Sequence, residues 1–175
     1  MSKIASIIAR EILDSRGNPT IETQITTDDG YSAVSSVPSG ASTGHYETLE
    51  LRDQDMDRYG GMGVLKAVAN VNQEIAPQLI GYDPTKQQEI DKLLINLDGT
   101  PTKMRLGANA ILSVSQGICE VSAASLQIPT YLYVKTLANN YGIPVSELSI
   151  PIPTFNLING WKHGAGILEF QELFL

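Results

Sequence analysis

Apolar and β-branched residues in the first forty positions follow the pattern of short β-strands. An apolar stretch begins at Ile4, and Thr20–Thr26 is rich in β-branched residues that partly alternate with polar ones. Tyr31–Val37 supplies a third segment of the same kind. Between the last two, Asp28-Asp29-Gly30 predicts a hairpin, and its Asp-Gly pair favours a turn of the primed type. The pattern predicts a small antiparallel meander of three strands.

Helical spacing replaces this pattern after residue 60. Apolar residues recur every three or four positions from Val64 to Leu79, where Pro77 predicts a break in the helix. Asp83-Pro84 is typical of a helix N-terminus, and Gly99 is typical of the position that follows a helix. We therefore expect a second helix between Asp83 and Gly99.

The remaining part of the chain predicts two more helices and then two more strands. Gly107–Leu126 is apolar on most faces and rich in Ala and Ser, which predicts a central helix that packs closely on its neighbours. A shorter helix is expected over Tyr131–Leu137, and Asn139–Pro144 is the best candidate for a linker. Beyond it, Ile150–Ile158 and Glu169–Leu175 each have the pattern of a strand.

Composition and charge narrow the class of protein. The 42% hydrophobic content is that of a globular chain, and the net charge of -7 disfavours nucleic acid as a partner because phosphate backbones would be repelled. No apolar run reaches the roughly 20 residues of a membrane helix, and Met1–Ala5 does not open a secretory signal. The single cysteine, Cys119, cannot form an internal disulfide, which fits a reducing compartment. We therefore expect a cytoplasmic protein without a membrane span.

The most unusual loop is Pro38-Ser39-Gly40-Ala41-Ser42-Thr43-Gly44. Its glycines and small side chains let the backbone approach a ligand, and its three hydroxyls could bind a hard cation. Taken alone, the loop is more simply a surface turn. By the same reasoning the residues Asp14–Gly17 mainly form a turn. The mixed charges of Glu47–Asp53 fit a solvated or locally paired structural segment better than a site.

A second candidate for chemistry lies near residue 165. Asn159–Gly166 is a glycine-rich loop that holds His163, one of only two histidines, and Gln171-Glu172 follows on an expected strand. A His and a Glu that converge at strand ends could do acid–base work. An ordinary loop histidine and an exposed strand residue are the alternative. No second His or Cys lies at the spacing of zinc ligands, so zinc is disfavoured.

Taken together and in order, these segments resemble the enolase family. The resemblance rests on several collinear motifs, which are Arg10–Thr20, Pro38–Gly44, Glu50–Asp53, Gly63–Val68, Asn70–Asn72, Ile75–Pro77, Leu97–Thr100 and Leu106–Leu112. It runs from about Ile4 to Glu172. Many motifs in the same order make chance a poor explanation.

The resemblance implies an α+β fold in two parts. Residues 1–139 would form the enolase-like amino-terminal domain, a three-stranded antiparallel meander followed by helices. Residues 140–175 would hold the linker and the first strands of an eight-stranded α/β barrel, which is incomplete here. The implied assembly is a homodimer, with Arg10 and Glu22 near its interface.

The implied activity is that of glycolytic enolase, which interconverts 2-phosphoglycerate and phosphoenolpyruvate with Mg²⁺ at two sites. Ser42 resembles the loop serine that helps hold the second, substrate-linked Mg²⁺. His163 resembles the loop histidine near the substrate, while Gln171 and Glu172 resemble the strand pair that binds 2-phosphoglycerate. Abstraction of the proton beside the substrate carboxylate builds up negative charge on that carboxylate, which enolase-type sites stabilise with magnesium. The resemblance also implies that Glu172 lies near the departing hydroxide.

Several groups of the family have no counterpart in these 175 residues. The proton-donating glutamate, the lysine base and the carboxylates of the first Mg²⁺ lie further along the barrel, which takes about 250 residues in full, whereas 36 residues follow Asn139. Trp161 also stands where the family has a second glycine. We therefore expect no turnover by the chain alone, and a non-catalytic scaffold or interaction domain is the rival function. An incomplete barrel leaves apolar faces, so Ile150–Leu175 should pack back on the helical domain or self-associate.

Overall fold

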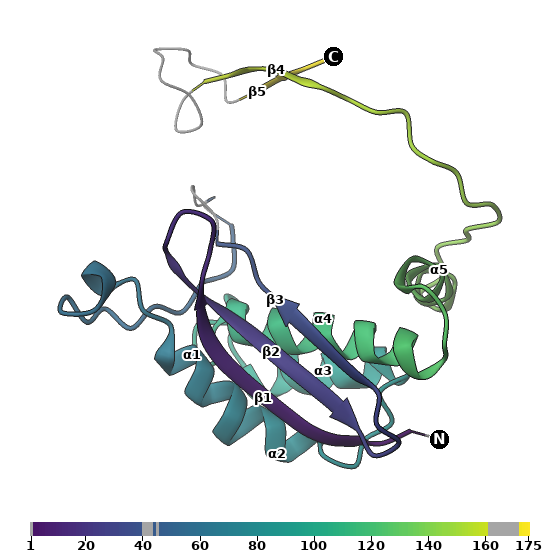
Figure 1. Cartoon of the computed structure of the whole chain (residues 1–175), viewed down its shortest axis with the longest axis horizontal. Helices are drawn as coiled ribbons and strands as arrows, with labels where there is room; N and C mark the ends of the chain where they lie inside the picture. The colour runs from purple at the N-terminus through teal and green to yellow at the C-terminus, as the bar shows by residue number, and fades with distance from the viewer. Residues whose placement is uncertain (1, 40–43, 45, 161–171) are drawn as a thin grey trace.

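The computed structural model describes residues 2–39, 44, 46–160 and 172–175. Figure 1 shows a three-stranded sheet with the helices on one side of it and an extended segment that leads away to a separate pair of strands. The elements in chain order are β1 (Ile4–Leu13), β2 (Pro19–Thr27), β3 (Ser32–Ser36), η1 (Tyr59–Gly61), α1 (Leu65–Asn70), η2 (Val71–Ile75), α2 (Ala76–Leu79), α3 (Gln87–Asp98), α4 (Ala108–Ser125), α5 (Thr130–Asn140), β4 (Asn156–Asn159) and β5 (Glu172–Phe174).

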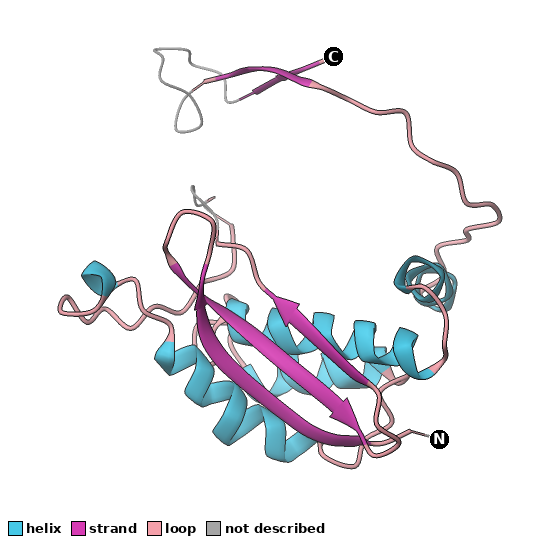
Figure 2. Ribbon diagram, in the orientation of Figure 1, coloured by secondary structure: helices cyan, strands magenta, loops and turns pink. Residues whose placement is uncertain are grey.

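The first three strands form the antiparallel meander that the sequence predicted. Their order in the sheet is β1-β2-β3, with Ile7 opposite Ile25 and Thr23 opposite Ser35. The three strands and the helices that follow them confirm the predicted α+β fold of the enolase amino-terminal domain (Figure 2). An α/β barrel is not formed by the described residues.

The turn between β2 and β3 differs from the prediction. Gly30 donates its N–H to the carbonyl of Thr27 at 3.0 Å, and Thr27 in turn donates to Tyr31 at 2.8 Å. Within this turn only Gly30 has a positive φ, 91°, whereas a type I′ turn requires positive φ at both central residues. The prediction of a primed turn was therefore wrong. The loop is longer than a two-residue hairpin turn, and one glycine in the left-handed region is enough to close it.

The core lies between the sheet and α4, which crosses β2 and β3. Ile21 and Ile25 of the sheet and Val114 and Ile118 of α4 are fully buried there. A Cβ atom on Gly117 would lie 2.9 Å from Cδ1 of Ile25, so the helix can approach the sheet this closely only with glycine at that position. This contact confirms the predicted central helix.

The helix predicted from Val64 to Leu79 does not break at Pro77. Instead α1, η2 and α2 run on without interruption, and η2 is a π-helical turn in which Ala76 donates its N–H to the carbonyl of Val71, five residues earlier. Proline has no N–H to donate. The π-helical turn just before Pro77 shifts the backbone hydrogen bonds from a spacing of four residues to five, and the helix continues through the proline. The side chain of Asn72, within this turn, hydrogen-bonds both the N–H and the carbonyl of Ala9 and covers the outer edge of β1.

The start of α3 also differs from the prediction, while its end agrees with it. Asp83 accepts hydrogen bonds from the N–H and the hydroxyl of Thr85 and so closes a separate turn, and the helix begins only at Gln87. At the other end Gly99 follows the helix with φ 71°, as a left-handed C-terminal residue.

The described residues beyond α5 include a separate two-stranded sheet. β4 and β5 pair with each other in antiparallel fashion, with Asn159 opposite Glu172, and Figure 2 shows them at the end of a long loop. The strand predicted over Ile150–Ile158 is confined to its last part, because Pro151 and Pro153 have no N–H to donate to a neighbouring strand.

Candidate functional site

The site residues expected from the sequence lie mainly outside the described residues. This applies to Ser42, His163 and Gln171. Glu172 opens β5, where its backbone is placed opposite Asn159, but its side chain is outside the described part as well. What the structure shows of the candidate site is therefore the stem of the 38–44 loop and the groups that hold it.

Arg52 holds that stem, and we call Arg52 and the groups that it binds the Arg52 cluster. One terminal nitrogen of its guanidinium donates to the hydroxyl of Ser39 at 2.8 Å and to Oε1 of Glu50 at 2.6 Å, which ties the start of the loop to the segment that follows it. The other terminal nitrogen donates to the carbonyls of Pro19 and Met62, both at 2.6 Å. Only an Arg offers several donors in one rigid plane, so this side chain can join four separate segments at once.

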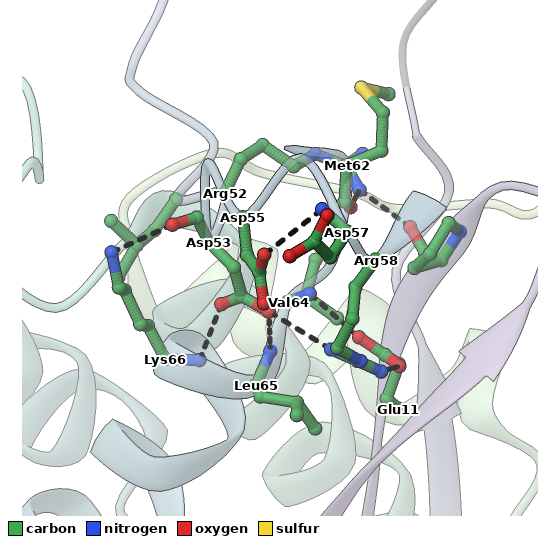
Figure 3. A network of polar contacts seen from close by, with 12 residues as sticks. Glu11, Arg52, Asp53, Asp55, Asp57, Arg58, Met62, Val64, Leu65 and Lys66 are labelled. Atoms are coloured by element: carbon green, nitrogen blue, oxygen red, sulfur yellow. Dashed lines mark hydrogen bonds and ion pairs between the residues drawn. The ribbon is translucent and has the colours of Figure 1, made fainter. Parts of the chain in front are cut away.

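A second ion-pair network lies next to Arg52 and fixes the segment that follows the loop (Figure 3). Arg58 pairs with Glu11 of β1 at 2.5 Å and with Asp53 at 3.3 Å. Its hydrogen bond to Glu11 raises the pKa of the Arg58 guanidinium. The network therefore attaches the segment between the loop and α1 to the edge of the sheet.

The carboxylates of this network also cap the first turn of α1. Asp53 accepts the N–H groups of Leu65 at 2.9 Å and Lys66 at 2.8 Å, while Glu11 accepts that of Val64 at 2.7 Å. Unpaired N–H groups at the start of a helix favour a negative charge nearby. Asp53 and Glu11, which are distant from each other in sequence, therefore cap this helix in place of a local N-cap residue. Of the two structural roles expected for Glu47–Asp53, the contacts of Glu50, Arg52 and Asp53 show local pairing.

An asparagine completes the support of this region, and sequence reasoning did not find it. Asn109, in the first turn of α4, accepts the N–H of Leu51 and donates to its carbonyl, both at 3.1 Å. The side-chain amide of Asn109 thus satisfies both backbone groups of Leu51, as a neighbouring strand would do in a sheet. No periodicity marks such a residue, although Arg52 and Asn109 both belong to motifs noted in the sequence.

Two other polar groups have structural contacts: Asp14 stabilises a turn, and Arg10 and Glu22 pair on the surface of the sheet. Asp14 accepts the N–H groups of Asn18 and Arg16, both at 2.8 Å, and the bond from Asn18 does most to lower the pKa of its carboxyl. This confirms the predicted turn role of Asp14–Gly17. On the open face of the sheet, Arg10 donates from Nε to Glu22 at 2.7 Å.

The described residues do not by themselves make a metal site. Within the part of the chain that the structure describes, no three His, Cys, Asp or Glu side chains gather so as to hold an ion. The acidic groups near the loop are already engaged, since Asp53 and Glu11 accept from Arg58 and from helix N–H groups. Cys119 is half-buried, and burial raises the pKa of its thiol.

Comparison with known proteins now identifies the family. The sequence model of the enolase N-terminal domain matches residues 4–134, which include the sheet, both ion-pair clusters and α1 to α4. The chain belongs to the enolase family. It is 53% identical to the enolase of Mastigamoeba balamuthi and 50% identical to that of Anaplasma phagocytophilum (strain HZ), over 175 residues in both cases.

These enolases are longer than the chain. The alignments cover all of the chain but only 38% and 39% of the two relatives, so the chain spans about two fifths of their length. In the described residues, no helix of the enolase-like chain has the length and apolar character needed to cross a membrane.

Proposed function

We propose that the chain forms the amino-terminal part of an enolase, which interconverts 2-phosphoglycerate and phosphoenolpyruvate in glycolysis. The observation that carries this proposal is the identity of about half of all residues, along the whole chain, to two enolases. The hydrogen bonds of Arg52 at the start of the 38–44 loop support it, because a loop that contributes to catalysis must be held in a fixed position by the residues around it.

We propose the same division of the chain that the sequence suggested. Residues 1–139 are the amino-terminal domain, and residues 140–175 are the linker and the first part of the α/β barrel. The end of α5 at Asn140 and the extended path beyond it support the boundary. The antiparallel β4–β5 pair is then the beginning of the second unit.

The residue roles follow from the family resemblance and remain proposals. Ser42 would supply a hydroxyl oxygen to the second Mg²⁺, which when bound stabilises the charge that develops on the substrate carboxylate. His163 and Gln171 would bind and orient 2-phosphoglycerate. Glu172 would lie beside the departing hydroxide, where a proton from a carboxylic acid converts it to water.

The assembly and location are proposed on the same basis. We place the enolase in the cytoplasm as a homodimer, with the exposed Arg10–Glu22 pair near the interface. Its small-molecule partners would be 2-phosphoglycerate and phosphoenolpyruvate.

The first experiment measures phosphoenolpyruvate formation by the 175-residue chain alone with saturating Mg²⁺. We expect no turnover, because the lysine base and the carboxylates of the first Mg²⁺ have no counterpart in these residues. Turnover that is lost in a Glu172→Gln variant would show that the chain is catalytically sufficient, and this proposal would then be wrong about the missing groups.

A further inference from the structure

The contacts of the 38–44 loop set one of its three hydroxyls apart. The sequence offers the hydroxyls of Ser39, Ser42 and Thr43 as possible ligands of a hard cation. Of these residues, Ser42 and Thr43 lie outside the described part of the chain, whereas Ser39 lies within it. The Oγ atom of Ser39 accepts a hydrogen bond from the guanidinium of Arg52 at 2.8 Å. This contact decides which role the Ser39 hydroxyl can have.

The contact with Arg52 makes Ser39 unsuitable as a metal ligand. A guanidinium is always positively charged, so a metal ion on the same hydroxyl oxygen would bring two positive charges close together. Arg52 is held where it is, because its side chain is only 13% exposed and its other terminal nitrogen donates to the carbonyls of Pro19 and Met62. The Ser39 hydroxyl therefore serves the loop through Arg52 and not through a metal ion.

Ser39 lies at the point where the backbone leaves the sheet. Val37 is still held by β2, since its N–H donates to the carbonyl of Ile21 at 3.1 Å and its carbonyl accepts from the hydroxyl of Thr20. Pro38 follows and has no N–H to donate. The bond from Arg52 to Ser39 is the next contact along the chain. The position of the loop start beyond the sheet thus depends on a side-chain hydroxyl.

A second side chain holds the far end of the loop. Gly44 donates its N–H to Oε2 of Glu47 at 2.7 Å, and the N–H of Glu47 returns to the carbonyl of Gly44 at 3.3 Å. Both ends of the loop are therefore attached to one segment, residues 47–52. That segment is itself fixed to α4, because the side-chain amide of Asn109 bonds both backbone groups of Leu51.

From these contacts we infer that Ser39 is a positioning residue of the proposed enolase reaction, because its bond to Arg52 holds the start of the loop in place before the substrate binds. A loop that is already held loses less conformational freedom on binding. Ser39 therefore raises the fraction of molecules that are ready to bind substrate and leaves the chemical step to other residues. This role rests on the proposed function, whereas the contact with Arg52 does not.

Hydrogen exchange of the 175-residue chain tests the contact itself. In a Ser39→Ala variant, peptides that contain residue 39 should exchange roughly tenfold faster, because a hydrogen bond to a charged group is lost. Ser39→Thr keeps a hydroxyl and should exchange like the native chain. The matched control is Ser36→Ala, since the Ser36 hydroxyl also bonds a charged side chain, Oε2 of Glu22 at 2.8 Å. Equal acceleration by Ser36→Ala and Ser39→Ala would overturn the inference.

The effect on the reaction is measured in a full-length enolase, in which the chain replaces the matching residues of the Mastigamoeba balamuthi enzyme. Calorimetry gives the affinity for phosphoenolpyruvate at saturating Mg²⁺, and kinetics give kcat and KM for 2-phosphoglycerate. Ser39→Ala should weaken binding and raise KM by roughly tenfold while kcat stays within about twofold, because only binding is lost. Ser39→Thr and Ser36→Ala should match the parent in both measurements, and thermal unfolding confirms that each variant keeps its fold.

A double-mutant cycle with Arg52→Met separates positioning from metal binding. If Ser39 acts through Arg52, adding Ser39→Ala to Arg52→Met should change KM by less than about twofold, since the donor is already gone. Equal effects of Ser39→Ala in both backgrounds would overturn the inference. An active parent whose KM and affinity do not respond to Ser39→Ala would overturn it alone, whereas an inactive parent that folds would contradict the proposed function and with it the role of Ser39 in the reaction.

Discussion

At the scale of single residues, Asp98 shows how a buried carboxylate holds this fold together. It is 3% exposed at the end of α3 and accepts the N–H of Leu106 at 2.8 Å and the N–H of Thr100 at 2.9 Å. Burial by itself would raise the pKa of Asp98, but the hydrogen bonds from Leu106 and Thr100 outweigh it and lower the pKa below the usual value. The charged form is therefore the one that the folded state stabilises.

An Asp98→Asn variant should lose about 1–3 kcal/mol of unfolding free energy at pH 7, because its amide turns a donor toward N–H groups that need acceptors. The carboxylate of the native chain contributes its stability above an ordinary pKa of roughly 3.9, and this is lost as the pH falls through the lower pKa of the folded state. Urea unfolding at a series of pH values measures both effects. The exposed Asp57→Asn is the control, and an equal loss in the two variants would contradict this account.

At the scale of elements, the Arg52 cluster decides where the 38–44 loop leaves the sheet. Arg52→Lys should lower the unfolding free energy by about 2–4 kcal/mol, because an ammonium cannot reach Ser39, Glu50 and two carbonyls together. Hydrogen exchange should also speed up in peptides that contain Ser39 and Glu50.

The control for this variant is Arg58→Lys, which weakens the neighbouring ion pairs to Glu11 and Asp53. We expect it to lower stability while the exchange of Ser39 stays unchanged. If both variants affect Ser39 alike, Arg52 has no special role at the loop stem.

The elements also show what sequence patterns can and cannot predict. Strands, the central helix and the C-terminal Gly99 follow from local periodicity and from the backbone preferences of single residues, and these were confirmed. The π-helical turn before Pro77 and the amide contacts of Asn72 and Asn109 depend on partners that are far away in sequence. Local patterns carry no information about such partners.

The candidate site residues were predicted in a different way, and their roles stay predictions. Ser42, His163 and Glu172 have no pattern of their own that separates a site from an ordinary loop or strand. They became candidates only through the order of the motifs around them. The Arg52 cluster was not predicted, because its function depends on four segments meeting in space.

At the scale of the whole molecule, we propose that this chain is the amino-terminal part of an enolase. The measurement that tests it most directly uses a chimera, in which the chain replaces the matching 175 residues of the Mastigamoeba balamuthi enolase, which is 53% identical to it. A second chimera that exchanges only residues 1–139 separates the proposed domain from the segment that follows it. A Ser42→Ala variant of the first chimera tests the proposed magnesium ligand.

Phosphoenolpyruvate formation is measured for each protein as a function of Mg²⁺ concentration. We expect the first chimera to form product within roughly tenfold of the parent rate, which corresponds to about 1.4 kcal/mol of activation free energy. Its Ser42→Ala variant should need more Mg²⁺ at an unchanged melting temperature. Two chimeras that fold and melt like the parent enolase but form no phosphoenolpyruvate would contradict the account and favour a non-catalytic scaffold.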